Sequence, residues 1–182
     1  LSAILPSGAA FLADDSADFF VVICIDSISV DFMKSLHKSV LIWYSPQQMF
    51  DVVTDVARYH EFLPWCHESS VKEQTAQGMK ASIGMKLAGF KQGFTTHNQH
   101  MFTADGGLAV QMELIDGPFS KLGGTWSFDP IRGSSTTACK VTLDLNYEIK
   151  NALLQMAIGS AFDKIAGSLV DAFIDRAKKI YV

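Results

Sequence analysis

A series of short strand-like segments that ends in one long helical segment limits this chain to few folds. Six segments between residues 69 and 149 are strand candidates, separated by turn signals of glycine, aspartate and proline, and the last of them alternates apolar with polar residues most cleanly. Short connections between successive strands indicate an antiparallel sheet. The spacing changes to helical from Ala152 to Ile180, which predicts a helix about 43 Å long. The expected fold class is α+β, a curved antiparallel sheet wrapped around a long C-terminal helix. The predicted strands are Ser69–Thr75, Met79–Leu87, Phe90–Phe102, Leu108–Ile115, Gly124–Phe128 and Thr137–Ile149.

One further strand, Leu36–Tyr44, is predicted before this series. Its apolar residues occupy both faces, with Ile42 on one face and Leu41 and Trp43 on the other. This pattern favours burial on both sides near the end of the strand.

A short helix should follow that strand. Ser45 is a suitable N-cap, Pro46 suits the first helical position, and Gln48 completes a capping box. The apolar spacing that follows predicts a helix that ends near Arg58. Pro64 prevents a simple continuation, so a turn or a second small helix should lie before it.

The long C-terminal helix contains two glycines, Gly159 and Gly167. Each costs about 1 kcal/mol relative to alanine inside a helix. Two such residues in one helix suggest a close backbone approach or room left for a ligand.

Composition indicates a large core or an apolar surface kept for a ligand. The 182 residues suffice for one domain with a sizeable core, and 48% are hydrophobic while 19% are charged. Charged residues average ~25% in soluble domains. Five of the 19 acidic residues precede residue 33, so 33–182 carries 15 basic and 14 acidic residues. This balance gives no electrostatic reason to expect DNA as a partner.

The charge pattern changes abruptly at residue 33. Residues 1–32 contain five aspartates and no lysine or arginine, and Met33 follows. Our hypothesis is that 1–32 is an N-terminal extension that is not native, and that 33–182 is the ligand-binding domain. A genuine extra strand or a partner-binding tail is the alternative. The apolar stretch Phe19–Ile25 is too short to span a bilayer, which takes about 20 residues, and lacks the basic region of a signal peptide.

Cysteine usage favours a reducing compartment. The three cysteines are odd in number and widely spaced, which does not resemble a disulfide framework. A cytoplasmic location is the simplest expectation.

Two aromatic segments point to an apolar ligand rather than to catalysis. They are residues 62–66 and 116–128, and each places large rings beside a residue that stiffens or turns the backbone. The sequence contains no nucleophile elbow and no phosphate-binding loop. His97 and His100 lie three apart in a probable strand and so face opposite sides, and Cys66 lacks a partner pair at ligand spacing. We therefore expect neither an enzyme nor a metal site.

Several blocks of residues carry a resemblance to a known family. They include Tyr59-x-Glu61-Phe62-Leu63-Pro64-Trp65-Cys66, Leu114-Ile115-Asp116-Gly117-Pro118-Phe119 and Leu122-x-Gly124-x-Trp126-x-Phe128. From about Lys38 to Tyr181, the chain resembles the coenzyme Q-binding START-domain family, whose members have the helix-grip fold. In bacteria this family overlaps with proteins named ribosome-association toxins. His60 stands where the family often has proline.

The resemblance implies binding of ubiquinone or a related isoprenoid quinone in support of respiration or quinone biosynthesis. Ubiquinone would be a bound ligand, with no cofactor required and no chemical turnover. Peripheral contact with the inner membrane would follow from such a ligand. The resemblance also implies a competing function, binding of the large ribosomal subunit and blocking of subunit association. The basic residues Arg176, Lys178 and Lys179 could serve that function, although a favourable charge at a helix C-terminus explains them more simply.

The candidate ligand-binding residues are apolar, and ordinary core packing is the alternative for each of them. Phe119 is expected at the edge or mouth of the sheet, and Trp126 and Phe128 should share one strand face. Trp126→Ala with Phe173→Ala should weaken quinone binding more than stability. The candidate walls are Phe62, Leu63, Trp65, Phe94, Met112, Phe119, Trp126, Phe128, Phe162, Ile165, Leu169 and Phe173. Polar candidates for a quinone carbonyl, each with a structural role as the alternative, are Thr95, Asn98, Gln111 and Tyr147.

Overall fold

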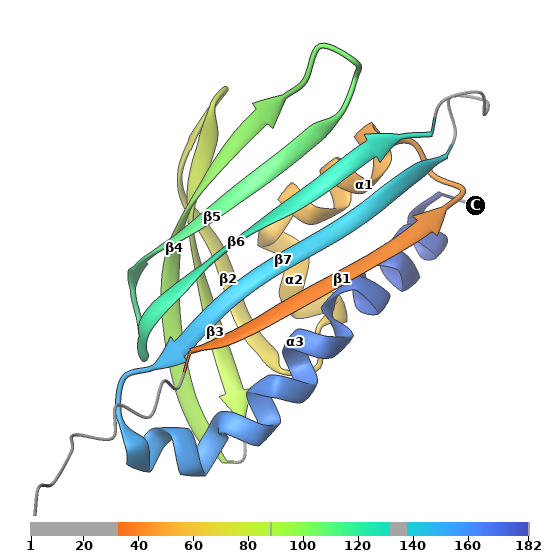
Figure 1. Ribbon diagram of the computed structural model, residues 1–182. Coiled ribbons are helices and arrows are strands. Elements are labelled where there is room, and N and C mark those ends of the chain that lie inside the picture. The colour runs from red at the N-terminus through yellow and green to blue at the C-terminus, as the bar shows by residue number, and fades with distance from the viewer. Residues whose placement is uncertain (1–32, 88, 132–137, 182) are drawn as a thin grey trace, which may run out of the picture. The chain divides into compact units, whose positions relative to one another are not determined.

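Seven antiparallel strands form one sheet, and helices cover its concave face (Figure 1). The computed structural model describes residues 33–87, 89–131 and 138–181. The hypotheses about residues 1–32 and the turn expected at 132–134 lie outside these residues. The strand order is β1-β7-β6-β5-β4-β3-β2, so only β1 connects to a strand distant in sequence. The strands are β1 (Lys34–Ile42), β2 (Cys66–Thr75), β3 (Gly78–Leu87), β4 (Phe90–Phe102), β5 (Leu108–Asp116), β6 (Phe119–Pro130) and β7 (Cys139–Ile149).

The predicted fold class is confirmed, and the largest error in the strand bounds concerns β6. Phe90–Phe102 was predicted without error, whereas β6 begins at Phe119 rather than at Gly124. Glycines usually weaken a strand, yet Gly123 and Gly124 both lie inside β6. In the structure, a Cβ on Gly124 would lie 2.2 Å from the backbone oxygen of Asp144 on β7. Glycine therefore permits close approach of two central strands at this position.

The expectation that both faces of β1 are buried is wrong. Leu41 is 68% exposed and Trp43, just after the strand, is 82% exposed. β1 is an edge strand whose inner face alone meets α3 (Ala152–Ile180), because no element of the described chain covers its outer face. The inner face carries Lys34 and Lys38 among its apolar residues.

Two lysines of β1 tie this edge strand to α3. Lys34 pairs with Asp163, and Lys38 Nζ lies 2.6 Å from Asp171 Oδ2. The two lysines are four residues apart on the strand, which is about 13 Å. The two aspartates are eight residues apart on the helix, which is about 12 Å, so both pairs can form at once. Burial alone would raise the pKa of Asp163, but hydrogen bonds from Lys34 and Tyr147 hold that pKa below its usual value.

The predicted capping box begins α1 (Pro46–Thr54). Ser45 Oγ accepts a hydrogen bond from the Gln48 backbone, and the Gln48 side chain accepts one from Ser45 N. The helix ends at Thr54 rather than near Arg58, because the backbone of Asp55 leaves the helical region. A 3₁₀ turn, η1 (Val56–Arg58), and a short helix, α2 (Tyr59–Phe62), carry the chain to Pro64.

The bounds predicted for α3 are confirmed, but the interpretation of its glycines is not. A Cβ on Gly159 would meet only the flexible side chain of Gln155, and a Cβ on Gly167 would meet nothing within 4 Å. Neither glycine lines the cavity described below. No helix among the described residues is long and apolar enough to cross a membrane.

Candidate ligand-binding cavity

An apolar cavity lies between the concave face of the sheet and the middle of α3. Its volume is about 80 Å³. Pockets that hold drug-sized ligands range from roughly 300 to 1,000 Å³. A ligand of that size therefore requires its lining side chains, or α3 itself, to move outward. The lining residues are Val56, Tyr59, Leu63, Trp65, Ile83, Phe94, Thr96, Asn98, Met112, Leu122, Gly123, Trp126, Leu145, Phe162, Ile165, Leu169 and Phe173.

Aromatic rings join the α2 side of the cavity to α3. Phe173 contacts Tyr59, Phe62 and Trp126 in edge-on geometry, with ring centroids 5.1, 5.4 and 5.2 Å away. The Tyr59 hydroxyl donates to the Val53 carbonyl, and burial raises the pKa of Tyr59, helped by the nearby charge of Asp55. Tyr59 is therefore a neutral packing residue.

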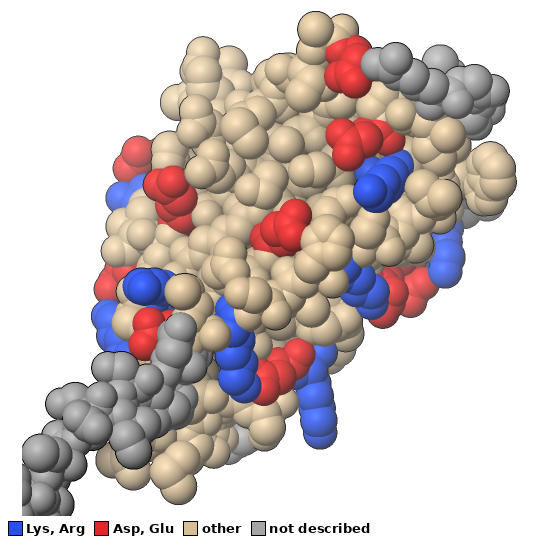
Figure 2. Space-filling model, viewed as in Figure 1, with Lys and Arg blue, Asp and Glu red and all other residues tan. Residues whose placement is uncertain are grey.

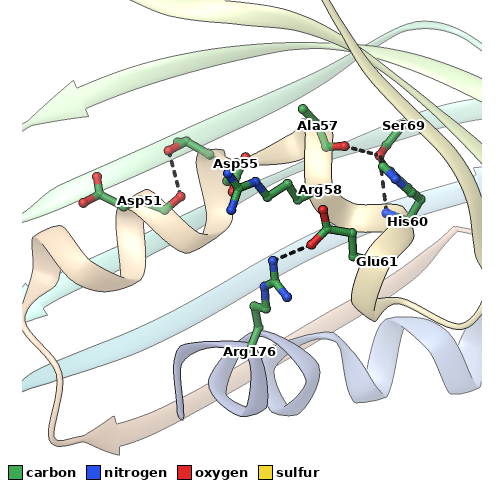
Figure 3. A network of polar contacts seen from close by, with 9 residues as sticks. Asp51, Asp55, Ala57, Arg58, His60, Glu61, Ser69 and Arg176 are labelled. Carbon is green, nitrogen blue, oxygen red and sulfur yellow. Dashed lines mark hydrogen bonds and ion pairs between the residues drawn. The ribbon is translucent and has the colours of Figure 1, made fainter. Parts of the chain in front are cut away.

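Polar contacts hold the same side closed at the surface (Figure 3). Arg176 of α3 points at α2, where its Nη2 donates to Glu61 Oε2 over 2.7 Å, and its guanidinium lies 5.2 Å from the centre of the Phe62 ring. His60 Nδ1 lies 3.0 Å from Ser69 Oγ, which links α2 to β2. An outward movement of α3 on this side must break the Arg176–Glu61 pair.

The side chain of Asn98 places a polar group in the cavity. It projects from the inner face of β4, is 7% exposed, and lines the cavity beside Thr96. Its buried Oδ1 has no hydrogen-bond partner among the described residues. Because the oxygen and nitrogen of an amide are assigned from their surroundings, Asn98 can offer either a donor or an acceptor here. A buried amide without a partner costs about 1–3 kcal/mol, so a ligand that bonds to it recovers that free energy.

The other polar candidates lie outside the cavity. Thr95 and Gln111 are on the outer face of the sheet, where Thr95 bonds to Ser82 and Gln111 donates to Glu113. Tyr147 is buried, and its hydroxyl donates to Asp163 Oδ1 over 2.6 Å. Burial and this bond raise the pKa of Tyr147, so the hydroxyl is already committed.

Nine of the twelve candidate wall residues line the cavity, and three do not. Phe119 is fully buried behind the cavity against Phe94 and Phe162, so the expectation that it lies at an edge or mouth is wrong. Phe128 stacks on Trp126, as two residues of one strand face should, but packs deeper in the core. Phe62 lies under Arg176. The nine lining residues are Leu63, Trp65, Phe94, Met112, Trp126, Phe162, Ile165, Leu169 and Phe173.

Sequence reasoning missed two kinds of lining residue. Thr96, Leu122 and Leu145 point inward by strand alternation, which the sequence does contain. Val56 and Tyr59 come from η1 and α2, whose path over the sheet no local pattern predicts.

Histidine and cysteine do not gather in this structure. Among the residues described, no three or more His, Cys, Asp or Glu side chains are grouped to hold a metal ion. His100 lies inward with a buried Nε2 that has no partner among the described residues, its ring centroid lies 5.0 Å from that of Phe50, and burial lowers its pKa. Burial raises the pKa of Cys66 and, to about 11, that of Cys139, so both thiols remain protonated.

The basic C-terminal cluster is largely neutralised. Arg176 pairs with Glu61, and Lys178 Nζ lies 2.8 Å from Asp175 Oδ1. Lys179 is the member without an ion pair among the described residues.

A curved antiparallel sheet that grips one long helix around an apolar cavity defines a START-like protein. Residues 42–174 match the family described as "Polyketide cyclase / dehydrase and lipid transport". The chain belongs to this family, because the match covers well over half of it.

The named relatives include bacterial toxins and a coenzyme Q-binding protein. The chain is 42% identical over 149 residues to the ribosome association toxin RatA of Vibrio cholerae serotype O1, covering 82% of this chain and 99% of the relative. It is 29% identical over 153 residues to the mitochondrial coenzyme Q-binding protein COQ10 of Drosophila melanogaster, covering 82% of this chain and 62% of the relative. A solved START superfamily protein from Mycobacterium smegmatis superposes with a TM-score of 0.57 at 18% identity, over 79% of this chain and 92% of that one. The predicted family and fold are thereby confirmed.

Proposed function

We propose that this protein binds the head of an isoprenoid quinone, ubiquinone or a close relative, in the cavity between the sheet and α3, without chemical turnover. The observation that carries this proposal is the buried side-chain oxygen of Asn98, which has no partner among the described residues and lies in a mostly apolar cavity. Apolar burial at about 25 cal/mol per Å² would supply most of the affinity, and Asn98 would orient the head. A relative named as a coenzyme Q-binding protein supports this ligand.

The size of the cavity sets the mode of binding. At about 80 Å³ the cavity must expand to admit a substituted ring, and the tail must leave between α2 and α3 or along α3. Opening on that side breaks the Arg176–Glu61 pair, in which the side chain of Arg176 is 16% exposed and that of Glu61 is 44% exposed. A fully exposed pair contributes only about 0–1 kcal/mol, but this partly buried pair also holds the guanidinium over the Phe62 ring, so opening costs both contacts. Such a carrier would work in the cytoplasm with peripheral contact at the inner membrane.

The direct test is extraction of the gently purified full chain with organic solvent, followed by mass spectrometry. Ubiquinone near one molecule per chain is the expected result. Absence of any isoprenoid quinone, combined with no binding of added short-chain ubiquinone in a fluorescence titration of the tryptophans, would contradict the proposal.

Asn98→Leu separates binding from folding. The variant removes an unsatisfied buried amide at nearly constant volume, so stability in urea should be unchanged or rise by about 1 kcal/mol. Affinity for short-chain ubiquinone should fall about tenfold, in line with one lost hydrogen bond. Ile83→Val, on the same wall but without a polar group, is the control and should retain affinity within a few-fold. Equal affinities of Asn98→Leu and the wild type would remove Asn98 from the site.

Ribosome binding is the second candidate function, and the 42% identity to a protein named a ribosome association toxin favours it. The protein would then bind the large subunit and block subunit association. The near-neutral domain and the paired C-terminal bases favour contact with a ribosomal protein over contact with RNA. Co-sedimentation of the full chain with purified large subunits, with small subunits as the control, checks this function.

A further inference from the structure

The first turns of α3 combine an absence of charge with exposed apolar side chains. Residues 151–162 contain no Asp, Glu, Lys or Arg, although seven charged residues follow in 163–180. Ile158 and Phe162 pack into the core, yet Leu153 is 81% exposed and Met156 is 83% exposed on the other side. A helix that is apolar all round is normally buried on all sides. This segment therefore has one face without a partner in the described chain.

Lysines surround that face and are not neutralised. Lys150 precedes the N-cap of α3 and Lys164 follows the uncharged segment, and neither forms an ion pair with a described residue. A positive charge at a helix N-terminus opposes the helix dipole, and the first turn holds no acid to compensate it. The electrostatic arrangement is unfavourable for the isolated protein and favourable beside an anionic surface.

The β3–β4 hairpin adds to the same end of the molecule. Because β3 and β7 run in the same direction within the antiparallel sheet, the end of β3 and the start of α3 lie at one end of the sheet (Figure 1). Lys86 and Lys91 are directly opposite each other on this hairpin, both exposed and without an ion pair in the described chain. Like charges at such positions destabilise a strand pair. Phe90 lies exposed beside them.

Lysine exceeds acid in the segments that turn at this end. In 86–91, 115–121 and 148–156, residue 88 apart, the lysines are Lys86, Lys91, Lys121 and Lys150, and the acids are Asp116 and Glu148. The space-filling view shows that charges of both signs are mixed over the visible face of the sheet (Figure 2). The lysine excess in the three segments accompanies the exposed side chains of Leu153, Met156 and Phe90.

From these observations, we infer that the first turns of α3 and the β3–β4 hairpin form a contact surface for anionic lipid bilayers. Leu153 and Met156 enter the boundary between headgroups and acyl chains, and the lysines meet lipid phosphates, as in an interfacial helix. A second copy of the chain fits less well, because a two-fold contact would place these lysines against themselves. The inference names the surface for the peripheral membrane contact of the proposed function and is independent of the quinone.

Vesicle co-sedimentation of the full chain tests this surface. Vesicles of phosphatidylcholine and phosphatidylglycerol in equal parts should bind the protein, and vesicles of phosphatidylcholine alone should bind it at least tenfold more weakly. Leu153→Gln with Met156→Gln should reduce binding to the anionic vesicles at least tenfold, since glutamine suits a helix about as well as leucine and methionine. Lys150→Gln with Lys91→Gln should reduce both this binding and its sensitivity to salt.

The opposite end of the sheet offers a matched control. Leu41→Gln with Trp43→Gln removes two apolar side chains of similar exposure and should leave vesicle binding unchanged. Binding that survives Leu153→Gln with Met156→Gln, or that is lost equally in the control, would assign the membrane contact to another surface. No vesicle binding by the wild type would overturn the membrane contact itself, while quinone extraction would still report on the cavity. A shift from dimer to monomer in the α3 variant would instead assign the face to a second copy.

Discussion

A chain that carries Trp126→Ala together with Phe173→Ala is expected to be largely unfolded at room temperature. Both rings are core residues, 3% and 2% exposed, and their centroids lie 5.2 Å apart across the sheet–helix interface. Truncation of such a ring to alanine costs about 3–5 kcal/mol. Two truncations approach or exceed the whole stability of a typical domain, about 5–15 kcal/mol. The sequence-based expectation that this double variant would weaken binding more than stability therefore does not follow from the structure.

Circular dichroism in urea, on the double variant and both single variants, measures this effect. Because the two rings touch, the two single costs are not expected to add without a coupling contribution. Leu169→Ala, at a half-buried cavity position, is a milder control and should leave the protein folded. A double variant with near-native stability would mean that the sheet and α3 can collapse onto the vacated space.

Gly124→Ala should strongly destabilise the centre of the sheet. The added Cβ would lie 2.2 Å from the carbonyl oxygen of Asp144 and 3.0 Å from the Cα of Leu145, both backbone atoms of the adjacent strand. Because β7 lies between β6 and β1, it cannot move away from β6 without disturbing its pairing with β1. We therefore expect the free energy of unfolding to fall by about 3 kcal/mol.

Gly167→Ala is the matched control for that substitution. Its Cβ would point into open space from the middle of α3, so the intrinsic helix preference should stabilise the protein by about 0.5–1 kcal/mol. Thermal unfolding of the two variants should therefore shift in opposite directions. Equal shifts would mean that β6 and β7 are not as close at Gly124 as described.

The sequence predicts elements well where a local pattern is repeated along the chain. The helical spacing in 152–180 persists over several turns, and turn residues lie on both sides of 90–102, at Gly89 and at 105–107, so both sets of bounds agree with the structure. Prediction fails where tertiary contact overrides the local pattern. Gly124 is inside β6 because β7 lies so close, and Trp43 is exposed because β1 is an edge strand.

The candidate site was predictable in its chemistry and less so in its geometry. Apolar residues on α3 and on inward strand positions had to meet, so residues such as Phe162 and Met112 could be chosen from spacing. Phe119 shows the limit of this reasoning. Its place after a proline turn suggested an exposed mouth, but the backbone turns inward and buries the ring. How deeply an inward-pointing side chain is buried depends on the curvature of the sheet. Strand alternation predicts which face a side chain is on but not this depth.

The two lysine pairs between β1 and α3 respond differently to the ways in which the cavity could enlarge. Because Lys34 and Lys38 are matched in spacing to Asp163 and Asp171, a slide of α3 along the sheet by one helical turn, about 5.4 Å, would break both pairs together. A swing about the β1 edge breaks neither. Rotation of α3 about β1 would therefore keep the two lysine pairs and break the Arg176–Glu61 pair, which ties the helix to α2. If the proposed ligand binds, a rotation of α3 about β1 keeps both lysine pairs, and the width of that opening, rather than the resting volume, sets the largest head that can enter.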